Sequence, residues 1–115
     1  MKTDVATLSQ ILERIERIES SGVTRGRFLA NLWDQDAVVR NLEIIGEAVN
    51  RLSDDSRKRA SGVRWSDIAG FRDIAIHAYD RLDLERTWQV VETELPALKR
   101  AVRSLLSPPG GKVSK

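Results

Sequence analysis

Apolar residues recur at spacings of three and four along most of this chain, which is the period of a helix that buries one face. The first run predicts a helix over roughly residues 4–20, capped by Thr3 or Asp4 and ended by Ser20-Ser21-Gly22. Its apolar positions are Val5, Leu8, Ile11, Leu12, Ile15 and Ile18. We expect residues 22–27, which follow this helix, to form a loop.

A second apolar stretch begins at Phe28 and includes Leu32 and Trp33. Asp34 is a suitable cap for a long helix that extends to about Leu52. Gly46 lies inside this predicted helix, where glycine costs about 1 kcal/mol relative to alanine. Because a glycine retained in a helix permits close approach of a second backbone, we expect Gly46 to lie at a tight helix crossing.

The second half of the chain predicts three further helical stretches. Ser53-Asp54-Asp55 caps a short helix that ends near Gly62, and Ser66 caps another that carries Ile68, Phe71 and Ile74 on its apolar face. We expect a turn at residues 80–83 and then helix from about residue 84 to residue 106. Pro96 must kink or restart this last stretch, because it cannot donate the interior hydrogen bond.

No segment alternates in the manner of a strand, so the fold class predicted is all-α, a bundle of four to five helices. The chain of 115 residues fits one domain, over residues 1–106, followed by a flexible tail at residues 107–115 that contains Pro108-Pro109-Gly110-Gly111. We find no internal repeat and no boundary between domains in the pattern.

Composition narrows the classes of function. A hydrophobic share of 41% and a charged share of 31% are typical of a globular domain, and no apolar run approaches the roughly 20 residues that cross a bilayer. The start has no signal-peptide pattern, so we expect a cytoplasmic protein without membrane contact. Cysteine is absent, which excludes disulfides, a thiol nucleophile and thiolate metal ligands.

The net charge is only +2, although the pI is about 9.3. The chain has no block of lysine and arginine like that of a non-specific nucleic-acid tail, so any contact with RNA must come from locally placed arginines. Arginines gather in three stretches, although each is more often part of a solvated helix face: Arg25 and Arg27; Arg51, Arg57, Arg59 and Arg64; and Arg81, Arg86, Arg100 and Arg103.

The candidate chemistry centres on His77, the single histidine. A lone histidine is more often structural, but this one lies five residues after Arg72 and two before Tyr79. Histidine transfers protons near neutral pH, arginine stabilises developing negative charge on a phosphate, and tyrosine offers a hydroxyl and a stacking face. These groups suffice for attack of a ribose 2′-hydroxyl on the adjacent phosphodiester, so the segment Arg72–Tyr79 predicts a metal-independent ribonuclease site that needs no cofactor.

Other chemistries have less support. One histidine and no cysteine leave only scattered carboxylates, without HExxH or EF-hand spacing, as metal ligands. A glycine-rich phosphate loop is absent from the sequence. The spacing leaves a Ser–His–Asp triad open, but no nucleophile-elbow motif supports it.

Helix geometry restricts how these groups meet. At about 100° per residue, Arg72 and Tyr79 lie about 20° apart, while His77 points about 140° away from Arg72. Either the helix ends near His77, or the site is assembled from two chains of a symmetric dimer. Asp73, four residues before His77, is either a partner that orients the imidazole or an exposed i,i+4 neighbour.

The segment Arg72-(four residues)-His77-Ala78-Tyr79 resembles the R-x4-H-x-Y motif of HepT-like proteins, the toxin branch of the HEPN ribonucleases. Residues 35–48 are similar to the long-helix signature of that family. Residues 65–73 resemble the approach to its motif, and residues 87–96 resemble its C-terminal part. The resemblance covers roughly residues 4–106.

This resemblance implies a HEPN-type helical bundle that forms a homodimer, with the motif in an interface cleft. It implies an endoribonuclease toxin of a type VII-like toxin–antitoxin system, acting on RNA. It further implies a cognate antitoxin, a minimal nucleotidyltransferase (MNT-domain) protein that silences the toxin by AMP transfer from ATP to the motif tyrosine.

Carried over by position, Arg72 and His77 are the catalytic pair, Asp73 has a supporting role, and Tyr79 is the site of AMPylation. Asp73 stands where relatives often have asparagine, and its charge opposes a phosphate. Four residues match the long-helix signature, with either packing or catalysis as their role: Arg40, Asn41, Glu43 and Glu47. The modest net charge and Asp73 favour one alternative, a non-catalytic HEPN-fold partner that binds a nucleotidyltransferase.

Overall fold

Eight helical segments and no strand make up the part of the chain that the computed structural model describes, residues 2–76 and 81–107. The prediction of an all-α fold is confirmed. The segments are α1 (Lys2–Ser20), α2 (Arg25–Ala30), α3 (Leu32–Asn50), α4 (Asp54–Arg59), α5 (Trp65–Ala69), α6 (Phe71–Ile76), α7 (Arg81–Thr93) and α8 (Leu95–Leu106). The predicted tail lies outside the described residues except for Ser107.

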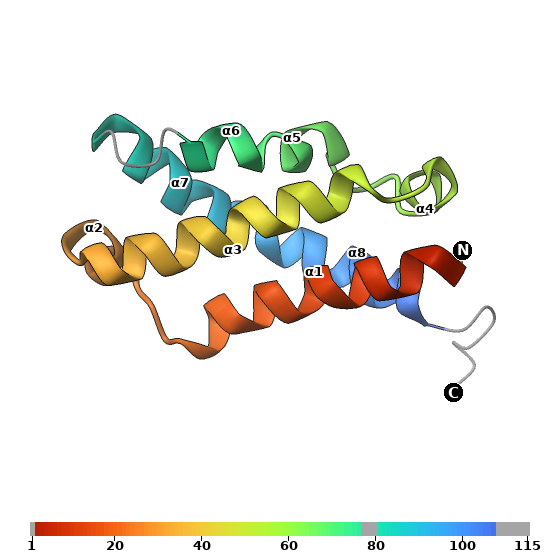
Figure 1. Cartoon of the computed structure of the whole chain (residues 1–115), viewed down its shortest axis with the longest axis horizontal. Coiled ribbons are helices and arrows are strands. Elements are labelled where there is room, and N and C mark those ends of the chain that lie inside the picture. Colours follow the sequence, from red (N-terminus) through yellow and green to blue (C-terminus); the bar gives the residue numbers. More distant parts are fainter. Residues whose placement is uncertain (1, 77–80, 108–115) are drawn as a thin grey trace.

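The segments combine into four antiparallel rods, formed by α1, by α3, by α5 with α6, and by α7 with α8 (Figure 1). The α3 helix is central, because it packs against α1 on one side and against α5 and α6 on the other. The α8 helix closes the bundle by packing against α1. The predicted count of four to five helices corresponds to these rods, and the additional segments are the short α2 and α4 and the halves of two interrupted rods.

Two local causes interrupt those rods. The N–H of Gly70 bonds to the carbonyls of Ser66 and Asp67 and ends α5, and the carbonyl of Gly70 then accepts from the N–H groups of Asp73 and Ile74 at the start of α6. The second interruption confirms the effect predicted for Pro96, which lies in the first turn of α8, where a helix needs no N–H donor.

Asp4 is not the N-cap that its position predicts, since α1 begins at Lys2 and Asp4 lies inside its first turn. The Asp4 carboxylate is 2% exposed and accepts hydrogen bonds from Ser53 Oγ at 2.5 Å and Ser56 Oγ at 2.6 Å. Burial raises the pKa of Asp4, but the hydrogen bonds from Ser53 and Ser56 outweigh it and hold the pKa below its usual value. Asp4 therefore ties the start of α1 to the start of α4, where Ser53 is the predicted cap.

The segment between α1 and α3 is more helical than its sequence indicated. Thr24 caps α2 by accepting from the N–H of Arg27, so helix begins inside the expected loop. The next correction concerns α3, whose cap is Asn31 rather than Asp34, because the Asn31 side chain accepts from the Asp34 N–H. Trp33 lies in the first turn of α3 and is 82% exposed, although the pattern had assigned it to an apolar stretch.

Two later helix starts also differ from the prediction. The α5 helix begins at Trp65 after Arg64, without a side-chain cap, so Ser66 lies within the helix instead of capping it. The α7 helix begins at Arg81, so the residues expected to form a turn are helical from that position onward. In both cases the helix begins earlier in the chain than the sequence predicted.

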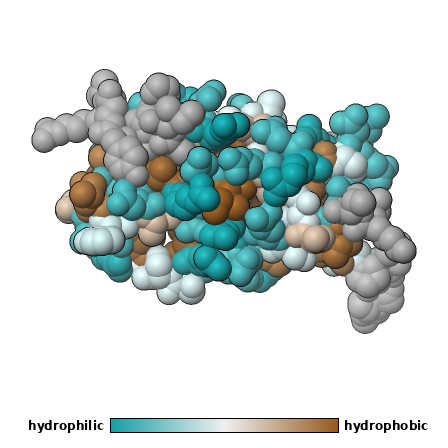
Figure 2. All heavy atoms as spheres, in the orientation of Figure 1, coloured by the Kyte–Doolittle hydropathy of each residue, from teal (hydrophilic) through white to brown (hydrophobic). Residues whose placement is uncertain are grey.

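The hydrophobic core lies between α3 and its neighbours. The Phe28 and Trp88 rings stack there with centroids 5.5 Å apart, which joins α2 to α7. On the face drawn in Figure 2, hydrophilic side chains dominate, and hydrophobic residues show only in small separate areas. No helix within the described ranges is long and apolar enough to span a bilayer.

Gly46 lies at the tight crossing that its position in the long helix predicts. A Cβ atom at this position would lie 3.2 Å from the backbone N of Arg72, 3.3 Å from Phe71 Cβ and 3.5 Å from the Ile68 carbonyl oxygen. The first two distances are shorter than comfortable carbon contacts, and one of the atoms belongs to the backbone. A side chain at this position would therefore push α3 away from the junction between α5 and α6 by a few tenths of an ångström.

We expect Gly46→Ala to lower the free energy of unfolding by about 1 kcal/mol. Alanine gains about 1 kcal/mol of helix propensity, but the crowding at the crossing costs about 1–3 kcal/mol. Urea denaturation measures the difference. Gly26→Ala in α2 is the matched control, because a Cβ there meets nothing within 4 Å, and it should leave stability unchanged or higher. Equal stability of the two variants would contradict the tight crossing.

Candidate functional site

Arg72 is placed by the crossing at Gly46, which holds the first turn of α6 against α3. Its side chain is exposed and makes no hydrogen bond or ion pair with any described residue. It is therefore an available cation at the start of the motif. His77 and Tyr79, the other two motif residues, lie outside the described residues.

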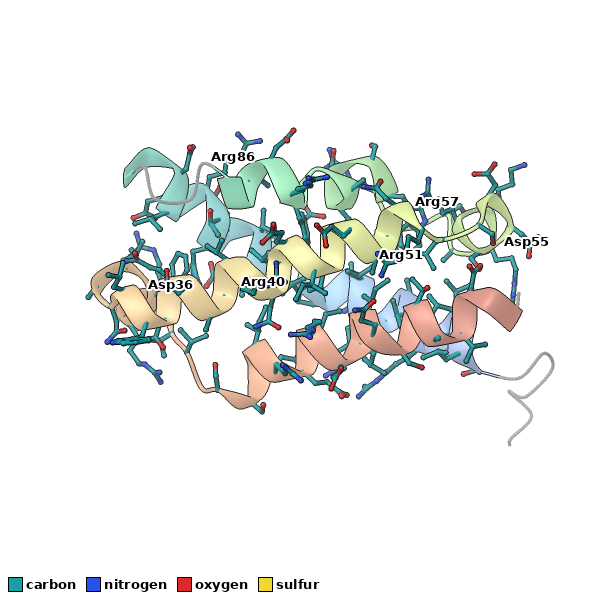
Figure 3. The ribbon with its side chains drawn as sticks, in the orientation of Figure 1. Asp36, Arg40, Arg51, Asp55, Arg57 and Arg86 are labelled. Atoms are coloured by element: carbon teal, nitrogen blue, oxygen red, sulfur yellow. The ribbon has the colours of Figure 1, made fainter. Side chains whose placement is uncertain are left out.

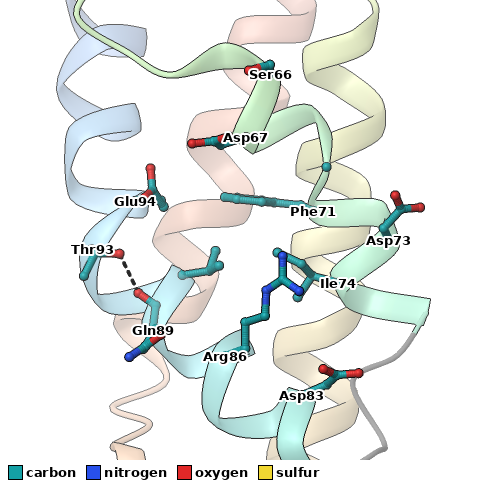
Figure 4. A pocket seen from close by; sticks show the side chains of 12 residues that line it. Ser66, Asp67, Phe71, Asp73, Ile74, Asp83, Arg86, Gln89, Thr93 and Glu94 are labelled. Atoms are coloured by element: carbon teal, nitrogen blue, oxygen red, sulfur yellow. Dashed lines mark hydrogen bonds between the residues drawn. The ribbon is translucent and has the colours of Figure 1, made fainter.

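A cleft of about 470 Å³ opens between the rod formed by α5 and α6 and the rod formed by α7 and α8 (Figure 4). The residues that line it are Ser66, Asp67, Gly70, Phe71, Asp73, Ile74, Asp83, Arg86, Gln89, Val90, Thr93 and Glu94. Asp73 therefore belongs to the cleft wall. Arg72 does not line the cleft, since neighbouring positions on a helix point about 100° apart.

The side chain of Arg86 rises into this cleft toward Ile74, with Asp73 and Asp83 nearby (Figure 4). Among the described residues it has no hydrogen-bond or ion-pair partner. Among the described residues that line the cleft it is the one guanidinium, beside four carboxylates, of which Asp67 pairs with Arg64 at 2.8 Å. The carboxylates do not gather into a group that could hold a metal ion, within the residues searched.

The charge of this lining limits which part of an RNA the cleft accepts. Carboxylates repel phosphates at short range and accept hydrogen bonds from the exocyclic amino groups of bases. Arg86 supplies one contact suited to a phosphate. The cleft thus fits a base or a sugar edge better than a run of phosphates.

Sequence reasoning overlooked Arg86, because it was one of several arginines expected on solvated helix faces. The available signal was its spacing, since Asp83, Arg86, Val90 and Glu94 follow one another at intervals of three and four. That interval predicts a shared helix face. The sequence alone did not reveal that this face borders a cleft rather than solvent.

Three of the four signature residues of α3 have a partner among the described residues, and Figure 3 labels one of them, Arg40. Arg40, 64% exposed, pairs with Glu43 at 3.0 Å. Asn41 Nδ2 donates to the Ala37 carbonyl at 2.7 Å, and its Oδ1 accepts from Arg14 of α1 at 3.4 Å. Glu47 is partly buried. These contacts support the packing interpretation, with Asn41 joining α3 to α1.

Comparison with known proteins covers most of the chain. The family model described as ribonuclease HepT-like matches residues 11–105. A protein of Methanocaldococcus jannaschii named as a gamma-glutamylcyclotransferase and "putative RNase" is 38% identical over 92% of this chain, but this chain spans only 49% of that relative's length.

Two other relatives are similar to this chain over nearly their whole length. The "putative RNase" of Caldanaerobacter subterraneus subsp. tengcongensis is 37% identical over 92% of this chain and 96% of its own. The "probable ribonuclease HepT" of Thermococcus cleftensis is 37% identical over 80% of this chain and 86% of its own. No solved structure matches this chain.

Proposed function

Because this chain belongs to the ribonuclease HepT-like family, we propose that it is a metal-independent endoribonuclease with Arg72 and His77 as its catalytic pair. The observation that carries this proposal is the family match over residues 11–105, which includes every residue of the R-x4-H-x-Y motif. The exposed and unpartnered Arg72 supports it, since a guanidinium without an internal partner is free to bind a phosphate.

The proposed reaction is an internal transfer at one phosphodiester of RNA. His77 accepts the proton of the ribose 2′-hydroxyl as its oxygen attacks the adjacent phosphorus, and the bond from phosphorus to the 5′ oxygen breaks. Water protonates the leaving 5′ oxygen, His77 releases the proton it accepted to solvent, and a cyclic phosphate remains on the other product. Arg72 stabilises the charge that develops on the phosphoryl oxygens. Asp73 supports the site from the adjoining cleft wall.

We propose a shared site in a homodimer, with Arg72 of one protomer acting beside His77 of its partner. The support is helical geometry, because positions five residues apart on a regular helix point about 140° from one another. A two-fold axis brings two such faces together and creates two equivalent sites. The exposed positions of Arg72 and Asp73 leave this end of α6 available for that contact.

We propose that the enzyme is a toxin held inactive through Tyr79. A cognate MNT-domain nucleotidyltransferase would bind it and transfer AMP, with the tyrosine oxygen attacking the α-phosphorus of ATP and pyrophosphate leaving. The adduct adds a negative phosphate and a bulky nucleoside two residues from His77. It therefore repels and blocks the RNA phosphate on which His77 acts.

Purified protein should cleave RNA in the presence of a chelator, and two substitutions should abolish this activity. We expect His77→Ala to lower the rate by about 10²–10⁴, the usual contribution of a general acid–base group. Arg72→Ala should lower it by about 10²–10³ through lost charge stabilisation. Gel analysis of a labelled RNA measures both rates.

Arg17→Ala is the matched control for that experiment, because Arg17 is an exposed arginine far from the motif in sequence that pairs only with Glu13. It should cleave as the wild type does. Equal cleavage by His77→Ala and wild type would reject the catalytic pair. A wild type that binds its nucleotidyltransferase but cleaves no RNA would favour the non-catalytic alternative.

Mixing the two inactive variants tests the shared site. A heterodimer of Arg72→Ala and His77→Ala protomers contains one intact pair if the site is shared, and none if each protomer is self-sufficient. Random exchange of subunits makes about half of the dimers mixed, so about a quarter of wild-type activity should return. No recovery in a mixture that light scattering shows to be dimeric would refute the shared site.

Incubation with the cognate nucleotidyltransferase and ATP should add the mass of one adenylyl group to each chain. Tyr79 is the single tyrosine, so peptide mass spectrometry locates the adduct without ambiguity among tyrosines. Tyr79→Phe should remain unmodified and keep its RNA cleavage when the nucleotidyltransferase and ATP are present. An adduct on any other residue would overturn Tyr79 as the point of control.

A further inference from the structure

The arginines without internal partners are not scattered over the surface. Among the arginines with described side chains, four make no hydrogen bond or ion pair with any described residue: Arg59, Arg72, Arg86 and Arg100. Others of comparable exposure are neutralised, such as Arg25 by Glu85 and Arg103 by Glu16. Arg72 and Arg86 belong to the site already described, so Arg59 and Arg100 require a separate explanation.

Arg59 and Arg100 line one hollow of about 320 Å³ between the end of α4 and one face of α8. The other residues that line it are Ala60, Gly62, Val63, Ala97, Ala101 and Ser104. The α8 positions fall at intervals of three and four, so they form one stripe along the helix. Small side chains make up most of the rest of the lining, and Ser104 adds a hydroxyl.

The chemistry of this hollow is the opposite of that of the cleft. Within the part of the chain that the structure describes, no carboxylate lines it, whereas four line the cleft beside α6. Two guanidinium groups at one hollow repel one another, and an anion between them relieves that repulsion while accepting up to several charge-assisted hydrogen bonds. The hollow therefore selects phosphate oxygens.

The hollow and the cleft are successive parts of one seam between the same two runs of chain. Residues 59–63 face α8 in the hollow, and residues 66–74 face α7 and Glu94 in the cleft. The opposite wall is formed by positions of α7 and α8 that recur at intervals of three and four, and so share one helix face. They run from Arg86 through Val90, Glu94 and Ala97 to Ser104. The end of α4 borders the hollow, and Figure 1 shows α4 at the opposite end of the molecule from the start of α7.

We propose that the Arg59–Arg100 hollow is an accessory site that binds backbone phosphates of the RNA substrate. This inference rests on the proposed ribonuclease function. Because carboxylates repel phosphates from the cleft, affinity for the RNA backbone must come from arginines at its ends. Arg86 of α7 and Arg100 of α8 are fourteen positions apart, which is about 20 Å at the helical rise. A stacked strand with about 3.4 Å between phosphates covers that length in about six nucleotides.

The test compares the Arg59→Gln/Arg100→Gln double variant with wild type on RNA of about 20 nucleotides and of about 4 nucleotides. Binding is measured by fluorescence anisotropy in a His77→Ala background, so that no cleavage occurs. The double variant should bind the long RNA roughly tenfold more weakly near 0.1 M salt. The salt slope, which is the steepness with which the logarithm of the binding constant falls with the logarithm of the salt concentration, should decrease by about 1.4, at about 0.7 for each phosphate contact. Cleavage of the short RNA, measured with His77 intact, should be unchanged.

Arg103→Gln is the matched control, because it removes the same charge from α8 at a residue that pairs with Glu16. Its affinity for long RNA and its salt slope should match those of the wild type. Circular dichroism establishes that all variants fold. Equal weakening by the control and the double variant would overturn the accessory site and assign the effect to net charge.

Four further outcomes are decisive. Unchanged binding of long RNA by the double variant would overturn the proposal, as would a loss that extends equally to the short RNA. Loss of binding to the nucleotidyltransferase, with RNA binding intact, would also overturn it and make this a protein-docking surface. The last outcome is a wild type that cleaves no RNA yet still binds long RNA in a way that depends on Arg59 and Arg100. That result would support the accessory site and would reject only the ribonuclease assignment.

Discussion

The absence of a side chain at Gly46 is the constraint on which the site depends. It lets the central helix α3 lie within close contact of the backbone at Phe71 and Arg72, just after Gly70 ends α5. A backbone held this closely cannot rotate or slide without opening the core around Phe71. The crossing therefore sets the direction in which α6 starts. That direction places Asp73 in the cleft wall and leaves Arg72 exposed.

The distribution of charge along the seam depends on which arginines form ion pairs with carboxylates in the folded chain. Two arginines are neutralised by carboxylates far along the chain, Arg25 by Glu85 and Arg103 by Glu16, and others pair with near neighbours, as Arg64 does with Asp67. Those left without partners among the described residues lie at the motif, in the cleft and in the hollow between α4 and α8. A net charge of +2 thus conceals two regions of opposite character, a carboxylate-rich cleft and a basic hollow. For a polyanionic substrate this local distribution matters more than the total.

Helix ends show where sequence reasoning succeeded and where it failed. Ser53 and Pro96 act through their own backbone neighbours, so their effects on α4 and α8 could be predicted. The prediction of Asp4 as a cap was wrong because its carboxylate accepts hydrogen bonds from Ser53 and Ser56, about fifty residues away. The sequence around Asp4 does not indicate such distant partners. Asp34 failed because Asn31 offered an equally good cap three residues earlier, and contacts of α2 with α3 and α7 favour the longer helix.

The sequence by itself determined the amphipathic helices, the restart at Pro96, the need for a close crossing at Gly46 and the spacing of Arg72, His77 and Tyr79. Each of these depends on residues within a few positions of one another, where helical geometry relates sequence directly to space. Only the tertiary structure decided that Arg86 points into a cleft, that Asp73 lies in its wall, and that Arg59 and Arg100 share a hollow. Those facts depend on how separate helices pack, and packing is set by the whole core rather than by any local pattern.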